Sequence, residues 1–167
     1  MTPLLAPRNV FVLVFLGCAG AMLFALFFLE RFLGLAPCPL CVTQRLFMVL
    51  VGALALLAAV HGPGVLGRRI YASLCLLSAV AGGVVSGRHL WLQSLPEDRV
   101  PACGPGLDYL LETLPLFEAI GVIFRGDGNC AEEVWRFLGL TIPAQTLLVF
   151  AALAGISLWQ LLRRPPG

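Results

Sequence analysis

The sequence predicts an all-α membrane protein, a bundle of four transmembrane helices, and its composition is the first observation behind this prediction. Apolar residues (A, V, I, L, M, F, W, Y and C) make up 59% of the 167-residue chain, and charged residues make up 12%. Ordinary soluble domains carry about twice that charge, and a soluble fold of this size could not bury so much apolar surface. The second observation is a set of four apolar runs, each near the ~20 residues that cross a bilayer as a helix. The alternation typical of barrel strands is absent, which favours helices.

The four predicted helices belong to a single integral membrane domain over residues 1–167. They cover about residues 10–29, 42–61, 70–87 and 143–162. The first run follows Arg8 and could be a cleaved signal sequence, but its apolar stretch continues to Leu29, which favours retention as a spanning helix. The tight turn Gly62-Pro63-Gly64 predicts that the second and third helices are antiparallel neighbours. Pro143 suits the first turn of the fourth helix.

The arginines predict which side of the membrane each connection faces. The two termini and the link between the second and third helices contain arginine and no acidic residue; their arginines are Arg8, Arg68, Arg69, Arg163 and Arg164. The other two connections, about residues 30–41 and 88–142, contain all nine acidic residues. By the positive-inside rule, both termini are expected in the cytoplasm and these two loops outside it.

The second outward loop, residues 88–142, is far longer than a connection between neighbouring helices requires, and long loops are usually functional or disordered. Its segment Leu107–Phe124 mixes apolar residues with acids. We expect a short interfacial helix there, lying along the membrane surface. Helical character is expected to resume over Ala131–Leu138.

Four of the six cysteines fall in the outward loops: Cys38, Cys41, Cys103 and Cys130. Disulfides persist in oxidising compartments, so these residues read as two potential disulfides. A Cys-X-X-Cys pair serves either redox chemistry or metal binding. Structural zinc needs four ligands, and only His89 is available near the second pair, so no metal is expected. A static Cys38–Cys41 disulfide is also disfavoured, because it closes a small ring of little entropic value.

Cys41 is expected to be the reactive sulfur of the first pair. If the second helix begins near this residue, the positive end of the helix dipole favours the thiolate. Arg45 follows one helical turn later on the same face. A guanidinium at the membrane edge is a functional candidate, although interfacial snorkelling is an alternative. Its charge can stabilise the thiolate and donate hydrogen bonds to a carbonyl oxygen of a quinone dissolved in the bilayer.

The second pair is expected to connect this site to soluble thiols. Cys103 and Cys130 both lie in glycine-containing turns and can form an exposed disulfide, a kind that exchanges readily. A soluble thiolate can attack Cys103, and the released Cys130 can then pass electrons to Cys38 and Cys41. The alternative is a disulfide that only staples the loop.

Together these residues resemble the bacterial disulfide bond formation protein B (DsbB) family. The resemblance rests on the order of four helices, on Cys38-Pro39-Leu40-Cys41 followed by Gln44-Arg45, and on the distant pair Cys103 and Cys130. Further similar positions are Arg88, His89, Leu92, Gln93, Asn129–Glu132, Trp135, Phe137–Leu140 and Pro143. The resemblance covers nearly the whole chain.

The resemblance implies a thiol:quinone oxidoreductase of the bacterial inner membrane, with its redox loops in the periplasm. Its partner would be a soluble DsbA-like thiol oxidase that forms a mixed disulfide with Cys103. Cys130 would then engage Cys38 and release Cys41 toward ubiquinone or menaquinone. Arg45 would stabilise charge on the quinone, and His89 is expected either near it or as an interfacial filler. The lipid bilayer and the membrane quinone pool are further partners, and no nucleic-acid partner is expected.

Two other functions remain open. A quinone-linked thiol enzyme of the vitamin K epoxide reductase type would carry its Cys-X-X-Cys late in the bundle, whereas here the motif opens the second helix. A non-enzymatic scaffold or small transporter with structural disulfides would have polar residues at mid-membrane depth. The four runs contain few of these, chiefly Ser73 and Ser78.

Residues outside the proposed site have structural interpretations. Cys18 and Cys75 lie within apolar runs and are expected to be buried packing thiols. Gly83 and Gly87 form a G-x-x-x-G pattern, which predicts a close approach between helices.

Overall fold

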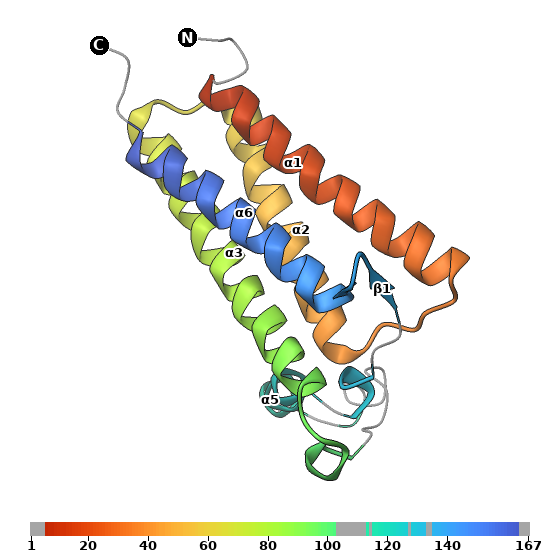
Figure 1. Ribbon diagram of the computed structural model, residues 1–167. Coiled ribbons are helices and arrows are strands. Elements are labelled where there is room, and N and C mark those ends of the chain that lie inside the picture. Colours follow the sequence, from red (N-terminus) through yellow and green to blue (C-terminus); the bar gives the residue numbers. More distant parts are fainter. Residues whose placement is uncertain (1–5, 103–112, 114, 127, 133–134, 164–167) are drawn as a thin grey trace.

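The computed structural model describes the chain except for residues 1–5, 103–112, 114, 127, 133–134 and 164–167. Among the described residues, four helices are long and apolar enough to cross a membrane. They are α1 (Pro7–Leu23) with its π-helical continuation η2 (Phe24–Phe32), α2 (Pro39–His61), α3 (Val65–Gln93) and α6 (Ile142–Leu162). The predicted fold class, an all-α four-helix membrane protein, is therefore confirmed (Figure 1).

The helices begin and end where local sequence allows it. Proline occupies the first turn of α1, α2 and α6, where its missing N–H costs no hydrogen bond. α2 ends at Gly62, whose positive φ of 57° forms a left-handed cap with its N–H bonded to the Ala58 carbonyl. The chain then turns directly into α3. α1 begins and α6 ends at the same end of the bundle as this turn (Figure 1).

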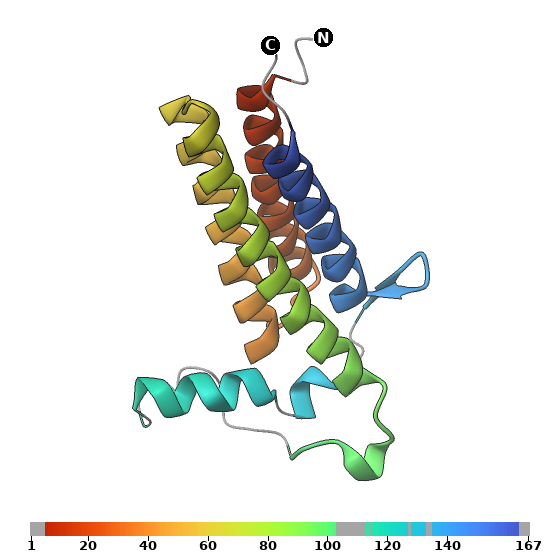
Figure 2. The ribbon, with the colours of Figure 1, turned by 90° about the vertical axis from the view of Figure 1, so that its left-hand side faces the viewer.

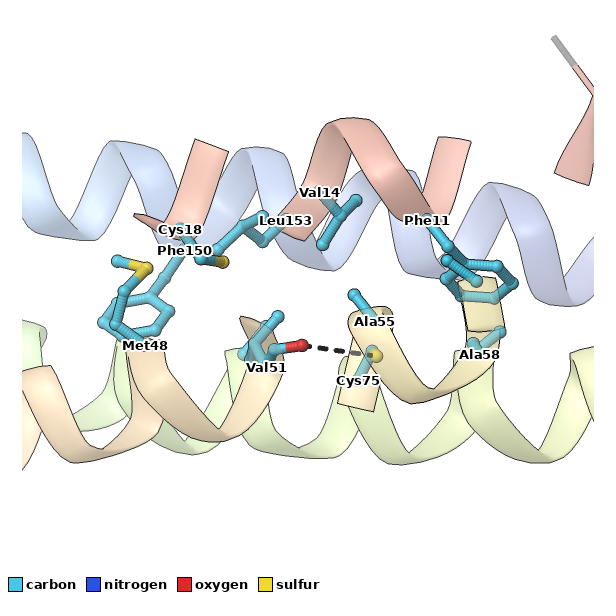
Figure 3. Packing of buried hydrophobic residues seen from close by; sticks show 13 residues of the cluster. Phe11, Val14, Cys18, Met48, Val51, Ala55, Ala58, Cys75, Phe150 and Leu153 are labelled. Atoms are coloured by element: carbon cyan, nitrogen blue, oxygen red, sulfur yellow. Dashed lines mark hydrogen bonds between the residues drawn. The ribbon is translucent and has the colours of Figure 1, made fainter. Parts of the chain in front are cut away.

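The helices pack as a series, with α1 against α2, α2 against α3 and α3 against α6. Their shared core consists of apolar side chains and small residues, including Phe11, Val51, Cys75 and Phe150 (Figure 3). Phe150 is fully buried, and its ring lies against the backbone of Gly82. A Cβ on Gly82 would be 2.3 Å from the ring, so glycine is required at this crossing.

Two helices extend well past their predicted C-terminal ends. The first continues through η2 to Phe32, so Glu30 lies in the helix and not in the following loop. The third runs to Gln93, six residues beyond the predicted end at Gly87. The guanidinium of Arg88 lies over the ring of Trp91, 4.2 Å from its centroid, and this contact accommodates the charge at the helix end.

The described part of the long loop gathers at the opposite end from the turn between α2 and α3. It contains η3 (Glu97–Arg99), α5 (Leu116–Arg125) and η4 (Gly128–Cys130), and α5 lies across the end of the bundle (Figure 2). α5 falls partly within the segment predicted to be helical, Leu107–Phe124, of which residues 107–112 and 114 are not described. Its location at a membrane surface stays a prediction.

The helix predicted over Ala131–Leu138 is wrong. A two-stranded antiparallel hairpin, β1 (Arg136–Phe137) and β2 (Leu140–Thr141), leads into α6 instead. Its turn residues Leu138 and Gly139 both have positive φ, 52° and 80°. Two-residue hairpin turns require this conformation, because its twist matches that of the paired strands.

Candidate redox site

The site is built around Cys38 and Cys41 at the N-terminus of α2. Cys38 is the N-cap residue, and its sulfur accepts a hydrogen bond from the Cys41 N–H at 3.4 Å. The Cys38 S–H donates to the sulfur of Cys41 over 3.1 Å. Both sulfurs are therefore reduced and close enough to form a disulfide with a small movement. The positive end of the α2 dipole lies beside them.

Cys130 is the third sulfur of the site. It ends η4, is completely buried, and packs with Leu40 and Leu92 from the ends of α2 and α3. Its sulfur lies within 4.8 Å of the Cys38 sulfur. The pKa of the Cys38 thiol is raised well above its ordinary value, first by its hydrogen bond with Cys130, then by that with Cys41 and by burial. These contacts therefore favour the thiol form of Cys38 over the thiolate.

The turn that carries Cys130 is held by close packing. Gly126, with a φ of +73°, lies directly against Leu40 and Leu92, so that a Cβ there would be 2.6 Å from Leu92 Cδ1. This contact joins the end of α5 to the ends of α2 and α3. Cys103, the predicted partner of Cys130, lies outside the described residues.

His89 on α3 faces the same sulfurs. Its Nε2 is 3.8 Å from the Cys38 sulfur, and its Nδ1 is 3.1 Å from the side-chain nitrogen of Gln44. Because the Gln44 amide N–H donates to Nδ1, the ring proton is assigned to Nε2, the ring nitrogen that lies 3.8 Å from the Cys38 sulfur. His89 is buried, so it lies inside the site and is not an interfacial filler.

Arg45 lies one turn along α2 from Cys41 and forms an ion pair with Glu30 of η2. Both side chains are partly exposed, 20% for Arg45 and 26% for Glu30. Sequence reasoning missed Glu30 because it assigned this residue to the loop. The sequence did contain a signal for this ion pair, namely an acidic residue at the end of an apolar run. A carboxylate at the edge of a membrane usually has a charged or hydrogen-bonding partner.

A largely apolar cavity of about 180 Å³ opens beside Cys41. It lies between α1 with η2, the start of α2, and α6, and its walls include Leu29, Cys41, Gln44, Arg45, Trp135 and Thr146. A dry cavity of ~150 Å³ accommodates benzene, so this one has room for a substituted six-membered ring. The residues present therefore fit a quinone headgroup, with a sulfur and a guanidinium in the same wall.

Cys18 and Cys75 are remote from this chemistry. Both are buried in the bundle core, and Cys75 donates a weak hydrogen bond to the Val51 carbonyl at 4.0 Å (Figure 3). The structure thus brings together five of the six predicted site residues, namely Cys38, Cys41, Arg45, His89 and Cys130, and adds Glu30 and Gln44.

Comparison with known proteins agrees with this geometry. Residues 7–160 match the family model described as disulfide bond formation protein DsbB. The chain belongs to the DsbB family. It is 51% identical over 164 residues to disulfide bond formation protein B of Saccharophagus degradans, covering 98% of both chains. It is 51% identical to the protein of the same name from Marinobacter nauticus, covering 94% of this chain and 93% of that one.

A third relative, disulfide bond formation protein B 1 of Pseudomonas aeruginosa, is 46% identical and covers 97% of this chain and 99% of its own length. Membership of the DsbB family makes the chain a disulfide-forming oxidoreductase with transmembrane helices. It also excludes the scaffold and vitamin K epoxide reductase alternatives as the family of this chain. The cluster of sulfurs at the N-terminal end of α2 is therefore the candidate redox site of this DsbB-family chain.

Proposed function

We propose that the chain reoxidises a soluble DsbA-type thiol oxidase and delivers the electrons to ubiquinone or menaquinone through Cys103, Cys130, Cys38 and Cys41. The observation that carries this proposal is the position of Cys38. Its sulfur is 3.1 Å from that of Cys41 and within 4.8 Å of that of Cys130. One sulfur with a neighbour on each side is the arrangement that consecutive disulfide exchanges require.

The electron path begins with a Cys103–Cys130 disulfide. The dithiol of the soluble partner attacks Cys103, becomes a disulfide itself, and leaves Cys103 and Cys130 as thiols. Cys130 then attacks the Cys38–Cys41 disulfide: a bond forms between Cys130 and Cys38, the bond between Cys38 and Cys41 breaks, and Cys41 leaves as a thiolate with the electron pair. Attack of Cys103 on Cys130 restores the first disulfide and frees Cys38.

The acceptor side is the cavity next to Cys41. Cys41, Arg45 and the apolar wall would hold a quinone there, and it would supply a two-electron, two-proton acceptor for re-forming the Cys38–Cys41 disulfide. Arg45 provides hydrogen-bond donors and positive charge in the cavity wall, where negative charge would develop on a bound quinone oxygen. His89 lies with its Nε2 3.8 Å from the Cys38 sulfur and is held there by Gln44, so it can help to position that sulfur.

Charge and fold both support a proposed orientation of the chain in the membrane. We place both termini in the cytoplasm and the redox loops in the periplasm of a bacterial inner membrane. One supporting observation is that the termini and the link between α2 and α3 carry arginines and no acid. The other is that the described loop elements lie at the opposite end of the bundle (Figures 1 and 2).

The experiment uses the full chain purified in detergent with a reduced DsbA-type protein and either quinone, and follows quinone absorbance. Cys41→Ser should abolish turnover, since its sulfur can no longer enter a disulfide, and Cys103→Ser should abolish it with the protein donor. Cys18→Ala and Cys75→Ala are matched controls and should turn over at the normal rate. Full activity of Cys41→Ser would disprove the proposed path.

A further inference from the structure

We propose that the reduced site binds one soft divalent metal ion, of the class of Zn²⁺ or Cd²⁺, through Cys38, Cys130 and His89. The sulfurs of the two cysteines and a ring nitrogen of the histidine all lie within 4.8 Å of one another. The residues come from three separate segments, the N-cap of α2, the helix α3 and the turn η4. The site is therefore formed by the fold and not by the Cys-X-X-Cys motif alone.

The spacing of the three atoms is close to that of a zinc site. Zinc bound to sulfur at about 2.3 Å and to nitrogen at about 2.0 Å in tetrahedral geometry separates neighbouring ligand atoms by roughly 3.5–3.8 Å. Cys38 Sγ and His89 Nε2 are 3.8 Å apart. No two of the three ligand atoms are more than 4.8 Å apart, which exceeds the ideal separation by about 1 Å. Rotation of the side chains can bring the atoms closer by that amount.

The surroundings also suit a metal. A small cavity of about 40 Å³ touches Cys38, Cys41 and His89, which is enough for one water as a fourth ligand. Gln44 already bonds the other ring nitrogen of His89 at 3.1 Å. A metal on Nε2 moves the ring proton to Nδ1, and rotation of the Gln44 amide then presents its oxygen to that proton. Metal-bound histidines usually have such a partner.

The chemistry makes binding dependent on redox state. Thiolates bind the ion and their protons go to solvent, while no sulfur–sulfur bond forms or breaks and no electrons are transferred. A Cys38–Cys41 disulfide has no thiolate at Cys38, so the oxidised chain lacks the site. Bound metal would hold the reduced form and block exchange at Cys38 and Cys130. The binding itself does not depend on turnover, so its test is separate from that of the proposed function.

The test titrates CdCl₂, and ZnCl₂ in parallel, into the full-length detergent-purified protein after reduction with a phosphine that is then removed. We expect one ion per chain, an ultraviolet absorption from cadmium–thiolate bonds, and no such band in the quinone-oxidised protein. Loss of a direct ligand in Cys130→Ser or His89→Ala should weaken binding at least about tenfold, since even outer partners of a ligand contribute that much. Circular dichroism checks that each variant is folded.

Controls separate this site from the other thiols. Cys75→Ala and Cys103→Ser should bind cadmium as the unmodified chain does, because neither residue belongs to the proposed set. Equal affinity of the folded His89→Ala and Cys130→Ser variants would overturn the proposal and assign binding to the Cys38 and Cys41 pair. Loss of binding in Cys103→Ser, or equal binding by the oxidised protein, would overturn it as well.

Discussion

The guanidinium of Arg45 is paired with the carboxylate of Glu30, fifteen positions earlier in the chain and on the neighbouring helical segment. Arg45 lines the cavity that contains Cys41, and Glu30 pairs with it from η2. Glu30 thus neutralises the fixed charge closest to the proposed acceptor. It also connects η2 to α2, the two segments that form one side of that cavity.

Glu30→Gln should increase the apparent affinity for quinone. The amide can still accept a hydrogen bond from Arg45 but no longer competes by charge for the guanidinium. A partly exposed ion pair contributes about 0.5–1 kcal/mol, so the KM for quinone should fall roughly two- to fivefold. Steady-state kinetics with varied quinone measures this. A KM that rises would mean that Glu30 positions Arg45 instead of restraining it.

Arg45→Gln should have the opposite and larger effect. A hydrogen bond from a charged donor contributes about 1.5–3 kcal/mol, so the KM for quinone should rise roughly tenfold or more, whereas the KM for the protein donor should not change. In this background Glu30→Gln should have no further effect on quinone kinetics. An additive double variant would contradict the direct coupling of these two side chains.

Cys130→Ala should make Cys38 easier to alkylate. The pKa of Cys38 is raised chiefly by its side-chain hydrogen bond with Cys130. Loss of that partner lowers the pKa toward its ordinary value, so more thiolate is present at a given pH. Mass spectrometry of the reduced protein treated with iodoacetamide should show a rate–pH profile for Cys38 displaced to lower pH. Cys75→Ala is the control, and an unchanged profile in Cys130→Ala would contradict this assignment.

Gly82→Ala should destabilise the bundle, and its neighbour provides the matched control. The new Cβ would lie 2.3 Å from the ring of Phe150, whereas a Cβ on Gly83 meets its nearest atoms at 3.8 Å, an ordinary contact. Overpacking of this kind costs about 1–3 kcal/mol. Unfolding followed by circular dichroism in denaturing detergent should show the loss for Gly82→Ala only. Equal stability of both variants would show that α6 shifts to relieve the contact.

Much of the fold is predictable because the bilayer restricts the choices. Four apolar runs of spanning length allow few arrangements, and the helices were found close to residues 10–29 and the three later runs. The ends of the helices were less predictable. Glu30 and His89 both belong to helices that continue past the apolar stretch, because an ion pair in one case and burial beside Gln44 in the other satisfy their polar groups.

Other features required knowledge of tertiary contacts. The G-x-x-x-G pattern drew attention to Gly83 and Gly87, but the close helix approach occurs at Gly82, and a Cβ on Gly87 would meet nothing within 4 Å. The G-x-x-x-G pattern alone does not predict which face of α3 packs against Phe150. Similarly, the short hairpin after residue 135 depends on positive φ at Leu138, which an exposed leucine rarely adopts and no local rule predicts. The proximity of Cys130 to Cys38 is a long-range contact of the same kind.

The complete burial of Cys130 has a consequence for selectivity. A protein thiol arriving from the aqueous side cannot touch this sulfur, so a bystander with a reactive cysteine has no direct entry to the inner pair. In the proposed path, electrons reach the inner pair only after a client has engaged a sulfur outside this buried group. We therefore expect a variant that exposes the buried turn at Gly128–Cys130 to oxidise the thiols of unintended proteins as well.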